Sequence, residues 1–258
     1  MMEDLTKLGE VNFEINQGIG TITFSHPSHN SLPGKLLQKL ADAITTTGED
    51  PDVKVILLKS GGDRTFCAGA SFNELIAIDD LDTGKRFFMG FANVINACRK
   101  CPKLIIGRVQ GKAVGGGVGL ASAVDYCLAT RYAQVKLSEL AIGIGPFVVG
   151  PAVERKMGVS SFSQLAINAT EFRSAEWAME RGLYAEVYED ASSLDEAVQA
   201  LAQQLVKSNP EAQRLIKQSF WQGTEDWDTL LEKRAEISGQ LVLSEYTKQA
   251  LARFNSDS

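Results

Sequence analysis

The spacing of apolar residues along this 258-residue chain predicts an alternation of strands and helices. Apolar and polar residues alternate over residues 11–15 and resume after Gln17-Gly18, which is typical of a β-hairpin with one buried face. Apolar residues then recur at helical spacing over residues 36–44. A continuous apolar run follows at residues 53–58, and such a run suits a strand that is covered on both faces.

The same rhythm continues through the middle of the chain. An apolar stripe at helical spacing over residues 82–98 leads to short strand patterns at residues 104–106, 126–129 and 135–137. Strands separated by helical segments indicate repeated β–β–α or β–α units. The sequence therefore predicts an α/β fold with parallel strand pairing.

Helical patterns dominate after about residue 147. Ser193 and Glu196 have the spacing of a capping box, and Asn209-Pro210 combines a helix cap with proline at the first helical position. We expect a core unit over residues 1–195 and a C-terminal helical region over residues 196–258. A helical appendage of this kind typically packs on a neighbouring subunit or covers a site.

Composition and charge narrow the range of functions. Hydrophobic residues make up 44% of the chain and charged residues 22%, which is typical of an ordinary globular protein. The net charge of −6 argues against nucleic-acid binding and against a membrane-surface role. Residues 1–10 contain no apolar run, and glycine and proline interrupt the weakly polar stretch at residues 140–153. We expect a cytoplasmic enzyme without a signal peptide or a membrane span.

Metal and thiol chemistry find little support in the sequence. Cys98 and Cys101 have CxxC spacing with cations between them, but no second pair completes a zinc site. No HExxH motif or carboxylate cluster indicates a metal. We interpret the cysteines as ordinary residues at a helix end, and we expect neither a metal nor a separate cofactor.

A glycine-rich turn is the most distinctive feature of the chain. Residues 111–119 contain five glycines, between an apolar strand and a small-residue helix expected at residues 120–124. Such a turn exposes backbone N–H groups, and a helix N-terminus adds unpaired donors with a partial positive charge. The turn can hold either a phosphate or a carbonyl oxygen that becomes anionic during a reaction.

The known phosphate and hydrolase motifs do not fit this turn. The dinucleotide pattern GxGxxG fails because Leu120 and Ser122 stand where it requires glycine, and no Gly-Lys-Ser/Thr ends the turn. The chain also has no GxSxG motif, and its two histidines, His26 and His29, lie beside Pro27 in a loop. Nucleotide binding and serine hydrolysis are therefore poor interpretations.

Two glycine-containing loops and one carboxylate remain as candidate chemistry. The loops, at residues 66–70 and 115–119, each follow a strand, and Glu139 follows a third strand. Two backbone N–H groups from separate loops can hold one thioester oxygen while a carboxylate moves a proton at the neighbouring carbon. Taken singly, the loops also fit simple tight turns, and Glu139 fits a surface charge or a cap. Their co-occurrence and order favour a joint site.

Four segments together resemble the enoyl-CoA hydratase/isomerase (crotonase) family. They are residues 66–72 (FCAGASF), 110–121 (QGKAVGGGVGLA), 135–144 (VKLSELAIGI) and 173–183 (RSAEWAMERGL), with Asp125 between the second and the third. The resemblance implies a crotonase-like spiral of ββα units with a helical C-terminal region. It also implies a homotrimer or hexamer that binds acyl-CoA thioesters, with CoA as part of the substrate. Acyl-carrier-protein thioesters are an alternative.

The resemblance also assigns roles to individual residues. The backbone N–H groups of Ala70 and Gly116 would form the oxyanion hole, and Glu139 would be the catalytic acid–base group. The substrate and its CoA would lie against a larger set of residues: Pro27, Ser28, His29, Asn30, Phe66, Ala68, Gly115 and Gly119.

Three departures from the family pattern bear on the reaction. The typical hydratase has a second glutamate at the position of Gly119, an aspartate usually stands where Ser71 is, and the chain ends four residues after Phe254. With one carboxylate, the leading expectation is reversible hydration of a 2-enoyl-CoA, and volume freed at Gly119 would admit a branched acyl group. The alternatives, in order, are Δ3–Δ2-enoyl-CoA isomerisation, decarboxylation of a 3-methylglutaconyl-type thioester, and non-catalytic acyl-CoA binding.

Overall fold

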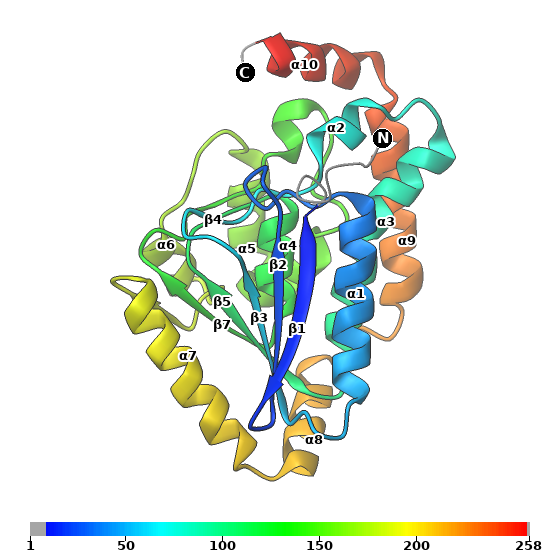
Figure 1. Ribbon diagram of the computed structural model, residues 1–258. Helices are drawn as coiled ribbons and strands as arrows, with labels where there is room; N and C mark the ends of the chain where they lie inside the picture. Colours follow the sequence, from blue (N-terminus) through cyan, green and yellow to red (C-terminus); the bar gives the residue numbers. More distant parts are fainter. Residues whose placement is uncertain (1–8, 257–258) are drawn as a thin grey trace, which may run out of the picture.

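Strands and helices alternate through the computed structural model, which describes residues 9–256 (Figure 1). The expectation that residues 1–10 hold no signal peptide therefore concerns residues that lie mostly outside the described part. No helix within the described part has both the length and the apolar character needed to span a membrane. The elements follow in this order: β1 (Glu10–Asn16), β2 (Ile19–Ser25), α1 (Gly34–Glu49), β3 (Val55–Ser60), β4 (Thr65–Cys67), α2 (Phe72–Ile76), α3 (Leu81–Lys100), β5 (Leu104–Val109), β6 (Lys112–Val114), α4 (Gly116–Ala123), β7 (Tyr126–Thr130), β8 (Val135–Lys136), the 3₁₀ helix η2 (Glu139–Ile142), α5 (Gly150–Ile167), α6 (Ala175–Glu180), β9 (Glu186–Tyr188), α7 (Ala191–Val206), α8 (Pro210–Phe220), α9 (Trp227–Val242) and α10 (Glu245–Ser256).

From β3 to β8, successive strands along the chain alternate between two sheets. Within residues 9–256, β3, β5 and β7 enter a six-stranded sheet with the order β1-β2-β3-β5-β7-β9, whereas β4, β6 and β8 form a three-stranded sheet. Pairing is parallel except between β1 and β2. Each turn of the chain adds one strand to each sheet and then a helix. This arrangement confirms the predicted α/β spiral of ββα units with a helical C-terminal region.

The large sheet is covered on both faces, as the apolar run at residues 53–58 predicts. Side chains alternate across it because successive Cβ atoms of a strand point to opposite faces. Ile56 and Leu58 of β3 belong to the main core, which they share with α1, α3 and α4. Val55 and Leu57 instead share a second cluster with Leu194 of α7. Figure 1 shows α7 on one side of the sheet and α1, α3 and α9 on the other.

The glycine turn is itself helical, which differs from the sequence expectation. α4 begins at Gly116 rather than at residue 120. The carbonyl of Gly115, whose φ is +52°, accepts hydrogen bonds from the N–H groups of Val118 and Gly119 at 2.9 and 3.3 Å. The left-handed φ of Gly115 turns the chain sharply out of β6, so the glycines that follow already form the first turn of the helix.

The caps of the C-terminal region differ in one place from the prediction. The capping box of α7 joins Asp190 and Ser193, through bonds of 2.9 and 3.3 Å, so the predicted box of Ser193 and Glu196 was wrong. The expected cap at Asn209 is confirmed, since its side chain accepts from two N–H groups at the start of α8. The predicted boundary between residues 195 and 196 falls inside α7.

The C-terminal helices pack closely on the core. Lys217 of α8 and Asp125 form an ion pair of 2.8 Å in which each side chain is 3% exposed, and Trp221 Nε1 donates to Asp125 at 3.0 Å. Breaking a buried pair leaves an uncompensated charge, so these contacts hold α8 in one position. α9 crosses α3 closely, because a Cβ on Gly84 would lie 3.0 Å from the Cα of Gly239. α9 is thereby placed where it can line a site.

Candidate active site

A cavity of about 200 Å³ lies where the loop after β4 and the start of α4 meet helix α3. Its wall is mostly apolar. The residues that line it are Ala68, Gly69, Ala70, Phe72, Leu75, Phe87, Phe88, Phe91, Gly115, Gly116, Ser138, Glu139, Ile142, Ile144, Gly145, Pro146, Phe147, Val148, Val149 and Ser238. Among these described residues, Glu139 has the sole titratable side chain. The cavity therefore brings together Ala70, Gly116 and Glu139, the three residues of the predicted chemistry.

The backbone around Ala70 directs its N–H group away from the neighbouring chain. Leu32 N–H donates to the Gly69 carbonyl at 2.8 Å, and Ser71 N–H donates to the Leu32 carbonyl at 3.2 Å. In extended backbone, successive peptide groups point in opposite directions, so the Ala70 N–H points away from Leu32. It has no acceptor among the described residues. A backbone N–H donor is therefore open to a ligand at this wall.

The Gly116 N–H group is the second open donor. Gly116 is the first residue of α4, where an N–H has no partner within the helix and lies at the positive end of the helix dipole. The Gly115 N–H before it donates to the Lys136 carbonyl of β8 at 2.8 Å, which fixes the turn. A Cβ built on Gly69, whose φ is +92°, would lie 3.6 Å from the Gly116 nitrogen. The two loops thus meet closely at this wall of the cavity.

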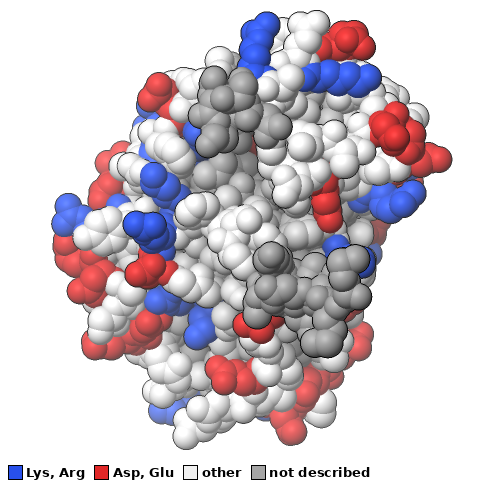
Figure 2. Space-filling model, turned by 45° about the horizontal axis from the view of Figure 1, so that its top comes forward, with Lys and Arg blue, Asp and Glu red and all other residues white. Residues whose placement is uncertain are grey.

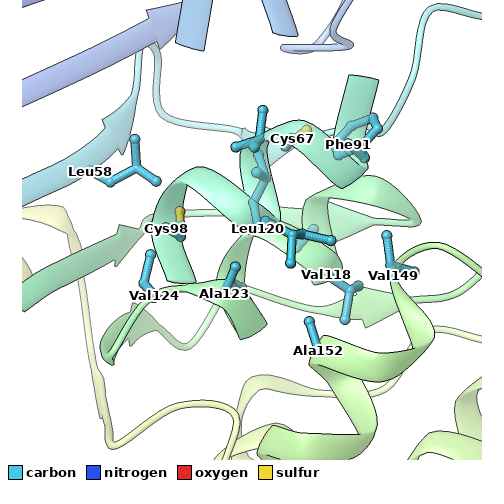
Figure 3. Packing of buried hydrophobic residues seen from close by; sticks show 14 of the residues in the cluster. Leu58, Cys67, Phe91, Cys98, Val118, Leu120, Ala123, Val124, Val149 and Ala152 are labelled. Carbon is cyan, nitrogen blue, oxygen red and sulfur yellow. The ribbon is translucent and has the colours of Figure 1, made fainter. Parts of the chain in front are cut away.

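Close packing requires glycine at four positions of this turn. A Cβ built at any of them would collide with a different neighbour: Glu139 at Gly115, the Phe91 ring at Gly116, the Cys67 carbonyl at Gly117 and Val149 at Gly119. Figure 3 shows Phe91, Cys67 and Val149 gathered around α4. The glycines therefore allow the tight packing of this turn.

Glu139 is half-buried, and one of its two carboxylate oxygens is buried without a hydrogen-bond partner. A Cβ on Gly115 would lie 2.9 Å from Glu139 Oε1, and Oε2 has no hydrogen-bond partner within residues 9–256. Burial raises the pKa of Glu139 to about 7, and a hydrogen bond from its own backbone opposes the shift. Both protonation states are therefore populated near neutral pH. A group of this kind can accept a proton and return it.

Comparison with known proteins identifies the family and supports the fold. A family model described as enoyl-CoA hydratase/isomerase matches residues 14–255. The chain belongs to the enoyl-CoA hydratase/isomerase family. Members of this family are enzymes that act as hydratases or isomerases, so the chain is an enzyme of this kind.

Individual relatives carry more than one reaction name. A protein of Clostridium acetobutylicum named short-chain-enoyl-CoA hydratase is 27% identical over 251 residues, covering 96% of this chain and 95% of its own. The peroxisomal Δ(3,5)-Δ(2,4)-dienoyl-CoA isomerase of Arabidopsis thaliana is 27% identical over 227 residues, covering 82% and 80%. The structure of enoyl-CoA hydratase from Bacillus halodurans superposes with a TM-score of 0.87 at 23% identity, covering 94% of this chain and 99% of that one. That likeness supports the fold.

Gly119 stands where the typical hydratase is expected to have its second glutamate, and it has no free space beside it in this chain. Gly119 does not line the cavity. A Cβ on Gly119 would lie 2.5 Å from Val149 Cγ1 and 2.9 Å from Val149 Cβ. Val149 itself lines the cavity, beside Val118 of α4 in Figure 3. The expectation that Gly119 frees volume for a branched acyl group was therefore wrong, because an apolar side chain already fills that volume.

The segment at residues 27–30, which is expected to bind CoA, contains both exposed and buried residues. Pro27, Ser28 and His29 lie exposed at the surface, and the His29 carbonyl accepts from the Ala68 N–H at 3.2 Å, which joins the two loops. Asn30 is buried and donates to the Gly61 and Thr65 carbonyls, both at 2.8 Å. Asn30 thus shapes the loop from within.

Phe66 does not reach the cavity. Its side chain is 1% exposed and packs edge-on against Phe24, with ring centroids 5.5 Å apart. Phe66 is part of the core that supports the loop at residues 68–70, and its backbone continues into that loop from β4.

Sequence reasoning missed most of the cavity wall, and three of the missed residues bear on the chemistry. Phe91 belongs to an apolar helical stripe, and nothing in that stripe separates a cavity wall from ordinary core. Val149 precedes α5 in a segment without a clear pattern. Ser238 lies in α9, where the neighbouring Gly239 is a signal of close helix packing but not of a site. Their positions depend on tertiary packing.

The cysteines are the remaining candidates for a second chemical centre. The four cysteines are unpaired and buried, and burial raises the pKa of the Cys67, Cys98 and Cys127 thiols to about 12. This supports the interpretation of Cys98 and Cys101 as ordinary helix-end residues. Figure 2 shows acidic and basic side chains interspersed on the face viewed. Within residues 9–256, no three His, Cys, Asp or Glu side chains gather as a metal site.

The contact between Gly119 and Val149 predicts a measurable coupling. Gly119→Ala should destabilise the protein by about 1–3 kcal/mol, because the new methyl group overlaps Val149. Val149→Ala in the same chain should recover part of that loss, so the double variant should be more stable than the sum of the single changes predicts. Urea unfolding measures all three. Gly34→Ala, whose new Cβ would meet its nearest neighbour at 3.6 Å, is the control. Additive changes would contradict the proposed overlap.

The buried carboxylate predicts a pH-dependent stability. The folded-state pKa of Glu139, about 7, lies above its ordinary value of 4.5, so the folded state holds more protons between these pH values. Stability should fall as pH rises through this window, by about 3 kcal/mol in total. Glu139→Gln removes the effect and should be more stable than the parent at pH 8 but not at pH 4. Urea unfolding across pH tests this, with exposed Glu196→Gln as control. Parallel curves for parent and Glu139→Gln would refute it.

Proposed function

We propose that this enzyme moves a proton on the acyl chain of an enoyl-CoA thioester, with Glu139 as its acid–base group. The observation that carries the proposal is that Glu139, among the described residues, is the sole titratable side chain lining the cavity. The Ala70 and Gly116 N–H groups would hold the thioester oxygen. One such donor stabilises a developing oxyanion by about 3–4 kcal/mol.

The reaction that this arrangement supports best is conversion of a 3-enoyl-CoA to a 2-enoyl-CoA. Ionised Glu139 takes a proton from C2, and the negative charge spreads to the thioester oxygen between the two N–H groups. The protonated Glu139 then returns the proton at C4, and the double bond moves to C2–C3. One carboxylate with a pKa of about 7 performs both steps.

Hydration, the leading expectation from sequence, becomes the second candidate. It requires a water molecule held and activated beside C3, a task that a second carboxylate performs in the typical hydratase. In this chain Val149 fills the corresponding space and offers no hydrogen bond. The name short-chain-enoyl-CoA hydratase of a relative that spans 96% of the chain favours this candidate.

Decarboxylation of a 3-methylglutaconyl-type thioester ranks below both. A substrate of that kind carries a second carboxylate, which needs a cation in a site of low polarity. Among the described residues that line the cavity there is no Lys, Arg or His. The wall therefore favours a neutral acyl chain.

The rest of the substrate would lie outside the cavity. Its volume, about 200 Å³, is below the roughly 300–1,000 Å³ of sites that enclose a whole ligand, so it suits the acyl part alone. CoA, or the equivalent arm of an acyl carrier protein, would lie along Pro27 to Asn30 and residues 66–70. A hollow beside His29 is lined by three cations, Arg64, Lys112 and Arg131, and by one carboxylate, Asp63. This excess of positive charge suits phosphate groups. We further propose a cytoplasmic homotrimer or hexamer that uses no separate cofactor.

Turnover of a substrate panel tests the proposal. The parent enzyme should convert 3-hexenoyl-CoA to 2-hexenoyl-CoA faster than it hydrates 2-hexenoyl-CoA. Glu139→Gln should lose at least about 10²-fold in kcat, the usual contribution of a positioned acid–base group. Exposed Glu196→Gln should leave kcat unchanged. An unaltered kcat in Glu139→Gln would refute the role of Glu139, and faster hydration than isomerisation would promote the second candidate.

A further inference from the structure

Helix α9 places a polar side chain in the apolar wall of the cavity. Ser238 lines the cavity and is 1% exposed. It reaches this wall because Gly239 and Gly84 let α9 and α3 approach closely, with a Cβ on Gly84 only 3.0 Å from the Gly239 Cα. The same face of α3 carries Phe87 and Phe88, which also line the cavity. Ser238 thus stands among aromatic side chains.

The hydroxyl of Ser238 has no hydrogen-bond partner among the described residues. A buried serine in a helix commonly donates to the carbonyl four residues earlier. Among the described residues, Thr45, Ser122 and Ser208 donate in this way to Ala41, Val118 and Gln204, at 2.8 to 3.1 Å. The Ser238 oxygen is not among the fully buried, unpaired side-chain atoms of the described residues, so it is accessible from the cavity that it lines. A ligand group in the cavity can therefore reach it.

The position of Ser238 defines which part of a ligand it meets. Phe91 packs on Gly116, at the end of the cavity that holds the oxyanion donors. Gly84, at the α9 crossing, precedes Phe91 by seven residues, which is about 10 Å along a helix axis. Ser238 therefore faces the part of an acyl chain that lies beyond the reacting carbons.

We propose that Ser238 is a specificity-determining residue that hydrogen-bonds to a hydroxyl or carbonyl group on the distal part of the acyl chain. The inference rests on the proposed function, because it takes the acyl chain to occupy this cavity. The absence of Lys, Arg and His from the described lining residues makes the group neutral. The substrate class is then an enoyl-CoA with an oxygenated chain rather than a plain hydrocarbon chain.

Binding of thioesters without a double bond tests this without any turnover. Calorimetry would compare hexanoyl-CoA with 4-oxo-, 5-oxo- and 6-hydroxyhexanoyl-CoA. The parent should bind at least one oxygenated thioester more tightly than hexanoyl-CoA, by roughly 2- to 10-fold, the contribution of one neutral hydrogen bond. Ser238→Ala should lose that preference while keeping its affinity for hexanoyl-CoA. Its thermal stability should not fall, since the hydroxyl has no partner within the described protein.

A matched variant and two contrary outcomes complete the test. Ser161→Ala removes another buried helical hydroxyl without a partner among the described residues, but away from this cavity, and should keep the preference. Equal binding of all four thioesters by the parent, or an unchanged preference in Ser238→Ala, would overturn the inference and leave the proposed function standing. Failure of every thioester to bind the parent would overturn both.

Discussion

Close packing at the first turn of α4 is the constraint on which the rest of the site depends. Protein interiors are packed about as densely as organic crystals, so one extra methyl group displaces a neighbour. Four glycines of the turn each meet a different neighbour at a distance that excludes a Cβ. These contacts bring the Gly116 N–H beside the loop of Ala70 and the carboxylate of Glu139 beside Gly115. One packing arrangement therefore positions both the proposed oxyanion donors and the proposed acid–base group.

The same packing accounts both for the absence of a second carboxylate beside Gly119 and for the raised pKa of Glu139. Val149 occupies the volume next to Gly119, so Glu139 stands alone in a largely apolar wall. Desolvation then governs its pKa, which rises to about 7. A lone carboxyl group with this pKa works equally well as base and as acid. That property suits a proton shift along a chain better than the activation of water.

The sequence predicted the order of strands and helices and brought two glycine-containing loops and Glu139 to one cavity, because these depend on local patterns and on recognisable motifs. It did not predict that α4 begins at Gly116, since glycine has a low intrinsic preference for helix and the turn is imposed by the left-handed φ of Gly115. Neither Val149 nor Ser238 was found, because segments distant in sequence bring them to the cavity. The expected space at Gly119 was wrong for the same reason.

The central claim is that one carboxyl group in a water-poor cavity both removes and returns the proton. The most direct measurement follows the isomerisation of 3-hexenoyl-CoA in D₂O, with the isotope at C4 of the 2-hexenoyl product determined by mass spectrometry at low conversion. Transfer by Glu139 alone predicts that a substantial fraction of the product keeps the hydrogen of the substrate at C4. Complete deuteration at C4 from the earliest time point would contradict it, since the proton would then come from solvent.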